Sequence, residues 1–293
     1  MHRNLANLAF VVGLIIVITA CVCRSDRDQE PGTPTPAKSE ANSVDVNDKG
    51  PVSSSKTAIR GEGDFKVEHL EVSNSKFAEL DRQVKNEKLL EKAADQLNRA
   101  LVLPHDIALR TKDCGEVNAF YDPNDPSVTV CYELMEHFYQ VFRTGGASSA
   151  KAYEKMFDAV RFVFLHEVGH ALIDTYKLPV MGNEEDAADR CSAYINLEEL
   201  GEDGVQAVFA AAEAFQIESK QSSAGKHDFA DEHLLQEQRF YNSLCMIYGS
   251  NSSKYENIVS QGFLPKERAK RCEAEYQRTT DSWRNLLAPW RNN

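Results

Sequence analysis

The sequence predicts an α+β fold that is predominantly helical, with a small β-hairpin or sheet beside one motif-bearing helix. Three observations support this class. Apolar residues recur at helical spacing over most of the chain after residue 131, whereas strand-like composition is confined to short segments between residues 107 and 131. The first 63 residues differ in composition from the rest, which places the folded domain at residues 64–293.

Residues 1–20 have the pattern of a secretion signal. Arg3 precedes an apolar run that is short for a membrane-spanning helix and ends in small residues. The junction Ile18-Thr-Ala-Cys21 resembles the lipobox of bacterial lipoproteins, in which the cysteine becomes the lipid-modified first residue. We expect a lipoprotein-type signal peptide, lipid on Cys21, and export to the periplasmic or outer face of a bacterial membrane. An ordinary cleaved signal and an uncleaved anchor are the alternatives.

Residues 21–63 are expected to form a flexible tether. They are rich in Pro, Ser, Asp, Lys and Gly, as in Pro31-Gly-Thr-Pro-Thr-Pro36, and contain few residues that can form a core. Such a spacer would hold the globular domain away from the membrane surface.

The elements of the domain follow in chain order. Leucines at helical spacing predict a helix over residues 77–101, and Leu103-Pro104 ends it. Short strands are predicted over residues 107–110, 118–121 and 127–131, and the Asp-Pro-Asn-Asp-Pro turn at 122–126 joins the last two as a hairpin. Helices are predicted over residues 134–142, 153–176, 184–200, 205–217, 234–248 and 266–287.

The helix over residues 153–176 contains His166-Glu167-Val168-Gly169-His170, an H-E-x-x-H motif. Residues four apart share one face of a helix, so both imidazoles can bind one metal ion while Glu167 acts on water. The flanking residues are apolar, as in a buried helix. The alternative is a core helix with two hydrogen-bonded histidines, which would need buried polar partners. The motif favours a site for one Zn²⁺ ion.

A third ligand is expected from the following helix. A metzincin would need Gly at position 173 and His at position 176, where this chain has Ile173 and Tyr176, so that class is excluded. Glu185 and Asp189 lie four apart on one face of the next predicted helix. We predict that Glu185 binds the metal and that Asp189 accepts a hydrogen bond from a ligand histidine. Glu184 is the alternative ligand.

Catalysis would need a base and a donor for the oxyanion. Glu167 is the predicted base, because it neighbours the first ligand on the helix. The donor is less well defined by the sequence, and His233 in Asp231-Glu-His233 is the preferred one. The full set of candidates is His227, His233, Arg239, Tyr241 and Tyr248.

Seven cysteines in an exported chain suggest disulfides. Cys114 and Cys131 flank the predicted hairpin, and Cys245 and Cys272 lie on successive C-terminal helices, so these are the two predicted pairs. Of the remaining cysteines, Cys191 is expected to be a buried thiol rather than a fourth ligand, and Cys23 has no assigned role.

The net charge of -12 argues against a nucleic-acid partner, since no basic patch stands out in the sequence.

Beyond the metal motif, the order of segments resembles a bacterial family described as putative metallopeptidases of unknown function. The resemblance covers roughly residues 65–290 and implies a gluzincin-like zincin domain with His166, His170 and Glu185 on zinc and Glu167 as base. The matching stretches are Cys114-Gly115, Asn118-Ala-Phe-Tyr-Asp-Pro123, Val130-Cys-Tyr-Glu-Leu134, His166 to His170, Glu185 to Asp189, Asp231-Glu-His233, Gln238-Arg-Phe-Tyr-Asn242, Leu264-Pro265 and Arg268-Ala269.

Three functions fit these observations. The first is a membrane-tethered zinc metallopeptidase that acts on peptides or proteins, with residues 127–131 as the edge strand that pairs with the substrate backbone. The second is a metal-binding or structural lipoprotein that cleaves nothing, and the third is a zinc amidase acting on cell-wall material. The presence of Glu167 favours an enzyme, because metal binding alone does not need that carboxylate.

Overall fold

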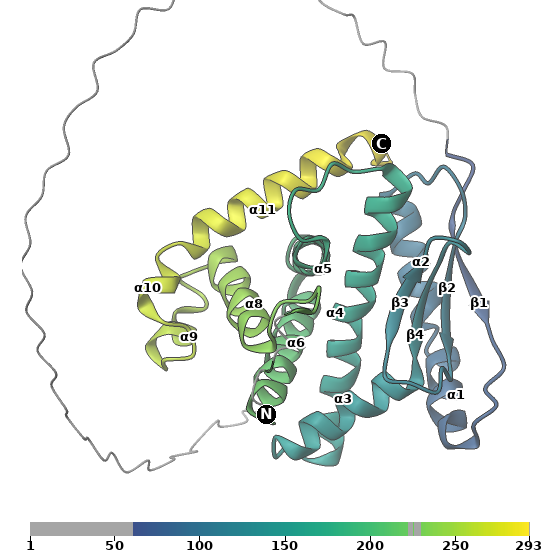
Figure 1. Ribbon diagram of the computed structural model, residues 1–293, viewed down its shortest axis with the longest axis horizontal. Coiled ribbons are helices and arrows are strands. Elements are labelled where there is room, and N and C mark those ends of the chain that lie inside the picture. The colour runs from purple at the N-terminus through teal and green to yellow at the C-terminus, as the bar shows by residue number, and fades with distance from the viewer. Residues whose placement is uncertain (1–60, 222–224, 226–229, 293) are drawn as a thin grey trace, which may run out of the picture. The chain divides into compact units, whose positions relative to one another are not determined.

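A mixed four-stranded sheet and a long central helix organise the domain (Figure 1). The computed structural model describes residues 61–221, 225 and 230–292. The predicted signal peptide, Cys21, nearly all of the predicted tether and the candidate His227 lie outside these residues. Within them, no helix is both long enough and apolar enough to cross a membrane.

The sheet combines parallel and antiparallel pairs. Its strands are β1 (Phe65–His69), β2 (Ile107–Lys112), β3 (Ala119–Asp122) and β4 (Ser127–Cys131), in the order β1-β2-β4-β3. β2 pairs in parallel with both β1 and β4, and β3 and β4 form the predicted antiparallel hairpin. β1 was not predicted, because Phe65 and Val67 give only two apolar residues in alternation.

One face of the sheet is apolar and the other is polar. Leu109 lies beside Val128 in the register of β2 and β4, and both are fully buried in the core under the helices. Arg110 lies beside Thr129 on the opposite face, where it binds Glu68 of β1. This alternation follows from the two-residue period of a strand.

Helices supply the rest of the domain, and the predicted, predominantly helical α+β class is confirmed. α4 contacts the sheet through β3 and β4 and also contacts α3, α5 and α6 (Figure 1). The helices are α1 (Ala78–Asn86), α2 (Leu89–Ala100), α3 (Tyr132–Thr144), α4 (Ser149–Tyr176), α5 (Glu184–Glu199), α6 (Gly201–Gln221), α8 (Gln236–Ser250), α9 (Glu256–Ser260), α10 (Lys266–Ala269) and α11 (Cys272–Leu287), with short 3₁₀ turns at Ser75–Phe77 and Ala288–Trp290.

Two predicted helices are each broken into two. The helix predicted over residues 77–101 is interrupted at Lys88, whose φ of 53° is left-handed, so that α1 and α2 are separate elements. The helix predicted over residues 266–287 is interrupted between Ala269 and Cys272, which separates α10 from α11. Apolar spacing alone did not show either break.

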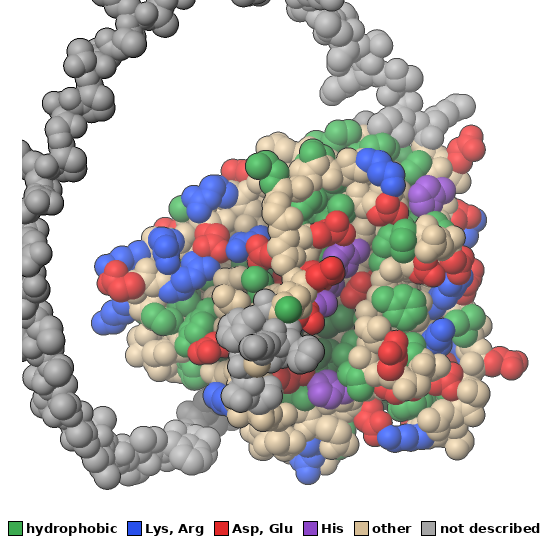
Figure 2. Space-filling model, viewed as in Figure 1, with side chains coloured by type: hydrophobic (Ala, Val, Ile, Leu, Met, Phe, Trp, Pro, Cys, Tyr) green, Lys and Arg blue, Asp and Glu red, His purple; other side chains and the backbone are tan. Residues whose placement is uncertain are grey.

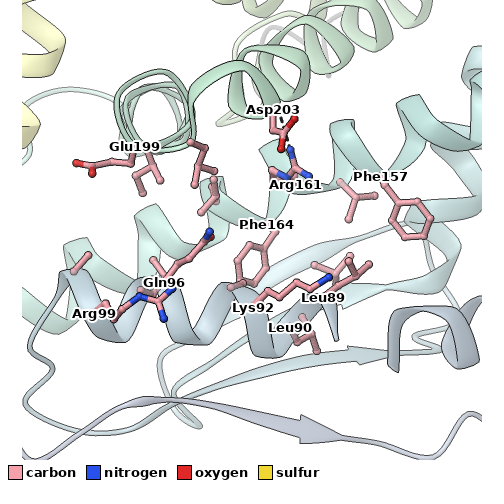
Figure 3. A pocket seen from close by; sticks show the side chains of 18 of the residues that line it. Leu89, Leu90, Lys92, Gln96, Arg99, Phe157, Arg161, Phe164, Glu199 and Asp203 are labelled. Atoms are coloured by element: carbon pink, nitrogen blue, oxygen red, sulfur yellow. Dashed lines mark hydrogen bonds between the residues drawn. The ribbon is translucent and has the colours of Figure 1, made fainter. Parts of the chain in front are cut away.

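A cavity of about 760 Å³ lies between α2 and α4 (Figure 3). Leu89 and Leu90 of α2 and Phe157 and Phe164 of α4 are among the residues that line it. Its described lining contains neither histidine nor cysteine. The residues of the predicted metal site line a different cavity, on the other side of α4.

Candidate metal centre

The H-E-x-x-H motif lies in the middle of the central helix α4. Ser148 caps the start of this helix, where its side chain accepts a hydrogen bond from the backbone N–H of Lys151. His166 and Glu167 are buried, at 3% and 8% exposure. The two motif histidines share one helix face, and their Nε2 atoms lie 3.2 Å apart. The helix thus presents two imidazole nitrogens toward one point.

The start of α5 brings a carboxylate to the same point. Asn183 caps this helix by accepting a hydrogen bond from the backbone N–H of Glu185 at 2.7 Å. Close approach of α4 and α5 depends on Gly169, because a Cβ there would lie 3.1 Å from the Cβ of Cys191 and 3.2 Å from the Cα of Ala188. The glycine inside the motif therefore lets the two helices meet.

Three donor atoms form a compact triangle. Oε2 of Glu185 lies 3.1 Å from Nε2 of His166 and 3.4 Å from Nε2 of His170, and the third side is the 3.2 Å between the histidines. Tetrahedral zinc with ligands at about 2.0 to 2.1 Å places its donor atoms roughly 3.3 to 3.4 Å apart. Two imidazoles and a carboxylate are also a donor set that zinc prefers, so the residues present fit a zinc ion.

Glu184 takes a different place from Glu185. Its Oε1 lies 2.8 Å from Nδ1 of His170, the nitrogen that faces away from the triangle. Its side chain is 53% exposed, whereas that of Glu185 is 16% exposed. The structure therefore brings Glu185 into the triangle and leaves Glu184 as a partner of the outer nitrogen of His170.

Asp189 holds the outer nitrogen of the other histidine. Its Oδ1 lies 2.8 Å from Nδ1 of His166, and both of its oxygens accept hydrogen bonds from Arg239 of α8. Burial alone would lower the pKa of His166, but the hydrogen bonds to Asp189 and Glu185 outweigh it and raise the pKa to about 9. Burial would raise the pKa of Asp189, yet Arg239 and His166 keep it well below its usual range.

Glu167 lies beside the triangle without belonging to it. Burial raises the pKa of its carboxyl group, and the backbone N–H of Tyr121 in β3, which faces the carboxylate, opposes that rise. The hydroxyl of Tyr121 donates to Asp174 at 2.9 Å, which fastens β3 to α4. This contact between strand and base was not predicted, because no local sequence pattern links residues 46 positions apart.

His233 reaches the site from the segment before α8. Its Nε2 lies 2.9 Å from Oε2 of Glu185, and its Nδ1 lies 3.1 Å from Oδ1 of Asp231. The hydrogen bond to Glu185 raises the pKa of His233 above its ordinary value, although burial opposes it. The donor atoms of His166, Glu185 and His233 all lie within 4.8 Å of one another. His233 is thus close enough to act on a group bound at the triangle.

The other candidate donors are placed differently. The guanidinium of Arg239 is held by Asp189, and its Cζ lies 4.2 Å above the ring of Phe215. Tyr241 and Tyr248 pack against a second hydrophobic core. Of the candidates in the described part of the chain, only His233 is directed at the proposed ligands.

The prediction that residues 127–131 form the edge strand that pairs with the substrate was wrong. β4 (Ser127–Cys131) lies between β2 and β3 and is buried throughout, so that β3 is the edge of the sheet on this side. The backbone N–H of Cys131 donates a hydrogen bond to the carbonyl of Asn118. In an antiparallel pair, hydrogen-bonded and non-hydrogen-bonded residues alternate along each strand. The N–H and C=O groups of Ala119 and Tyr121 therefore point away from β4.

The site opens into a cleft of about 710 Å³ between β3, α3, α4 and α6. In the space-filling view, histidine side chains lie in the hollowed centre of this face, with acidic side chains around them (Figure 2). Residues 117–119 line the cleft on the β3 side, and His166, Glu167, His170 and Glu185 line it on the side of α4 and α5.

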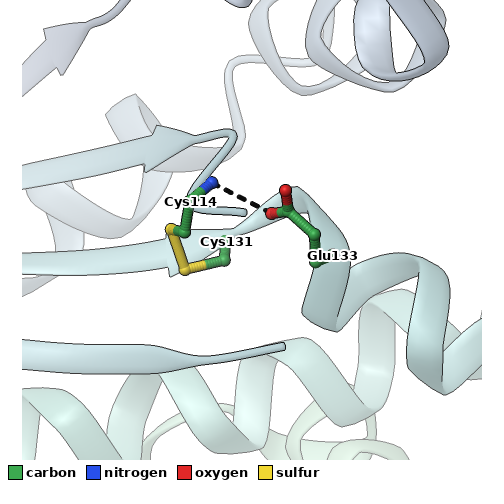
Figure 4. Close-up of side chains that lie close together, drawn as sticks. All are labelled: Cys114, Cys131 and Glu133. Carbon is green, nitrogen blue, oxygen red and sulfur yellow. Dashed lines mark hydrogen bonds between the residues drawn. A yellow bond between two sulfur atoms is a disulfide. The ribbon is translucent and has the colours of Figure 1, made fainter. Parts of the chain in front are cut away.

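A second group of possible metal ligands near this cleft, Cys114, Cys131 and Glu133, instead holds a loop in place. Cys114 and Cys131 form a disulfide, so their sulfur atoms are not free to bind metal (Figure 4). Glu133 accepts hydrogen bonds from the backbone N–H groups of Cys114 and Gly115, at 3.0 and 2.9 Å. These contacts fix the loop that leads into β3.

A second disulfide joins Cys245 and Cys272, and Cys191 is buried and free. Both pairs are those that the sequence predicts.

A family model described as "Putative metallopeptidase" matches residues 69–287 of the chain. No curated protein and no solved structure matches it significantly. The matched region contains β2, β3 and β4 and every described residue of the site.

Proposed function

The chain belongs to the family of putative metallopeptidases, and we propose that it is a membrane-tethered, zinc-dependent peptidase that cleaves peptide bonds in the cleft between β3 and α4. The observation that carries this proposal is the triangle formed by His166, His170 and Glu185 with the buried carboxylate of Glu167 beside it. Metal binding alone does not require the carboxylate of Glu167.

His166, His170 and Glu185 would hold the zinc ion. Bound zinc supplies Lewis-acid chemistry, because it polarises a carbonyl and lowers the pKa of water toward about 7. Asp189 and Arg239 keep His166 in the tautomer that presents Nε2 to the site.

Glu167 would act as the base. Its pKa is raised by burial, which makes its carboxylate a better proton acceptor near neutral pH. It would take a proton from the attacking water and deliver it to the leaving amine. The backbone N–H of Tyr121, which faces the carboxylate, would orient it for both transfers.

His233 would stabilise the oxyanion. Asp231 faces its Nδ1, which orients the ring and favours the imidazolium form, in which Nε2 also carries a proton. Its side chain is 48% exposed, so it can turn toward a substrate carbonyl in the cleft. A positioned donor of this kind is worth about 10² to 10³ in kcat.

A substrate backbone would pair with the edge strand β3. The outward-facing N–H and C=O groups of Ala119 lie next to the cleft, one pair along from the contact between Tyr121 and Glu167. Main-chain pairing would hold an extended peptide across the site. The same geometry does not require a particular side chain.

The tether is supported by the sequence alone. The lipobox-like Ile18-Thr-Ala-Cys21 and the Pro- and Ser-rich residues that follow would anchor the domain to a bacterial membrane outside the cytoplasm. Its partners would then be peptides or proteins of that compartment.

A peptide-library cleavage assay tests the activity, with Glu167→Gln as the inactivating variant. Glu154→Gln is the control, because Glu154 is an exposed carboxylate on the same helix. We expect zinc content to stay unchanged in both variants and cleavage to be lost only in Glu167→Gln. Equal cleavage by Glu167→Gln and wild type would contradict the mechanism. Absence of cleavage by wild type would favour a non-catalytic metal-binding protein, and cleavage of wall fragments instead of peptides would favour an amidase.

A further inference from the structure

We propose that the cleft contains a subsite for a basic side chain next to the scissile bond, with the carboxylate of Glu218 as the group that recognises the cation. This inference rests on the proposed peptidase function and names the class of substrate residue that the site selects. Lysine and arginine side chains belong to that class.

The subsite lies one helical turn from the proposed base. Val163 precedes His166 by three residues and Glu167 by four, so all three share one face of α4 and line the cleft. A helical turn rises about 5.4 Å, which is within reach of a residue adjacent to the scissile bond. The subsite is therefore directly adjacent to the proposed base, Glu167.

Its walls are apolar. Leu134 and Phe138 of α3 and Phe215 of α6 line the cleft beside Val163. They are 9%, 4% and 2% exposed, so they belong to the packed core and give the subsite fixed sides. Such walls suit the methylene stem of a long side chain.

Glu218 forms the polar end. It follows Phe215 by three residues on α6, and its side chain is 17% exposed. Its Oε1 lies 2.7 Å from Nε2 of His137 on α3, which holds the carboxylate in place. Within the described residues, Oε2 has no hydrogen-bond partner. One oxygen is thus fixed and the other can accept a bond from a ligand.

The charges around the cleft also favour a cation. The described lining contains five carboxylates and no lysine, and its single arginine, Arg239, is already bound to Asp189. Beside Glu218, away from the proposed zinc ion, a positively charged side chain would be attracted, whereas a carboxylate would meet like charge. The carboxylates are Glu167, Glu185, Glu218, Asp231 and Glu237.

The test uses three N-acetylated amino-acid hydroxamates, whose metal-binding group is the same and whose side chains are those of lysine, norleucine and glutamate. Calorimetric titration of the zinc-loaded full chain measures binding without any need for turnover. We expect lysine hydroxamate to bind about fivefold more tightly than norleucine hydroxamate, which lacks only the ammonium group, and glutamate hydroxamate to bind most weakly.

Glu218→Gln should bring the ratio between lysine and norleucine close to one while leaving the affinity for norleucine hydroxamate unchanged. That second value shows that the variant is folded and holds its metal. Glu232→Gln is the control, because Glu232 is exposed and does not line the cleft. This variant should keep the wild-type ratio.

The outcomes separate the two proposals. If none of the three hydroxamates binds to the zinc-loaded protein, the metal site and the peptidase function fail, and this inference fails with them. If lysine and norleucine hydroxamates bind equally well, only the subsite is overturned. A lysine preference that survives Glu218→Gln would likewise overturn the assignment to Glu218.

Discussion

The guanidinium of Arg239 donates two hydrogen bonds to the carboxylate of Asp189, from Nε at 2.8 Å and from Nη2 at 2.7 Å. The same carboxylate holds Nδ1 of His166, so a chain of contacts runs from α8 through α5 to the metal triangle on α4. Arg239 is 11% exposed and rests on the ring of Phe215 in α6. Four helices therefore fix the orientation of one proposed ligand.

Replacing Arg239 with methionine should weaken zinc binding by about 10- to 100-fold, as is typical when a partner of a ligand histidine loses its support. Asp189 would keep one neighbour instead of two and could turn away from His166. Arg239→Lys should restore part of the affinity, because one ammonium group can replace only part of the paired contact. Competition with a chromogenic chelator measures the dissociation constants.

Arg190→Met is the matched control for this prediction. Arg190 is also a half-buried arginine of this helical layer, but it binds Asp186 and Glu275, away from the triangle. It should lower thermal stability with little effect on zinc affinity. An equal loss of zinc affinity in both variants would show that Arg239 acts only through the stability of the fold.

The sequence predicted the parts of the site that depend on local spacing. His166 and His170, like Glu185 and Asp189, are four residues apart on a helix, and helical geometry alone places each pair on one face. Arg239 is 50 residues from Asp189, and its role depends on how α8 packs against α5. No pattern in either segment reports that packing.

In the sheet, too, only the features that depend on local sequence could be predicted. The hairpin of β3 and β4 was predictable, because the turn between the strands is short and rich in Pro and Asp. The position of β4 in the sheet was not, because it depends on the parallel pairing with β2, a contact made after a crossover. All five residues of β4 are buried, whereas the five residues of β1 have mixed exposure. This difference identifies the central strand, but it is visible only in the folded structure.

Glu185→Gln should lower zinc affinity by at least about 100-fold, because it removes a charged ligand from the triangle. Glu184→Gln should lower it by less than about tenfold, since Glu184 is exposed and touches only the outer nitrogen of His170. Metal analysis of the two purified variants after dialysis compares them directly. Loss of zinc in Glu184→Gln together with full zinc in Glu185→Gln would reverse the ligand assignment.

The metal-free protein should lose stability as pH rises from about 6.5 through about 9. The pKa of His166 is raised to about 9, so its contribution is complete below the unfolded pKa of about 6.5 and disappears as the folded form loses its proton. The pKa values of His170 and His233 are raised as well, in the same direction. Glu185 and Asp189 have lowered pKa values, so their contributions are lost only at acid pH.

Calorimetric melting curves of the metal-free protein at intervals across this range measure the effect, with a shift of roughly 2 to 4 °C in Tm for each kcal/mol. The zinc-loaded protein should show a smaller decrease, because its ligand histidines are already neutral and only His233 still titrates. A melting temperature of the metal-free protein that rises between pH 6.5 and 9 would contradict the predicted sign.

Removing the Cys114–Cys131 disulfide should affect both stability and the cleft. The bridge spans 17 residues, for which loop closure predicts about 3 kcal/mol of stabilisation. It also ties down the loop at residues 113–118, whose end lines the cleft and leads into the edge strand β3. The double variant Cys114→Ala/Cys131→Ala should therefore melt at a lower temperature and bind norleucine hydroxamate severalfold more weakly.

The second disulfide provides the comparison for this effect. Cys245 and Cys272 join α8 to α11 with a sequence separation of 27, and neither lines the cleft. Replacing both with alanine should lower the melting temperature by a similar amount and leave hydroxamate affinity unchanged. Because the two variants lose similar stability, a difference in hydroxamate affinity isolates the role of the Cys114–Cys131 bridge in holding β3 against the site. Equal affinities in the two variants would mean that Glu133 and the pairing with β4 hold the edge strand without the disulfide.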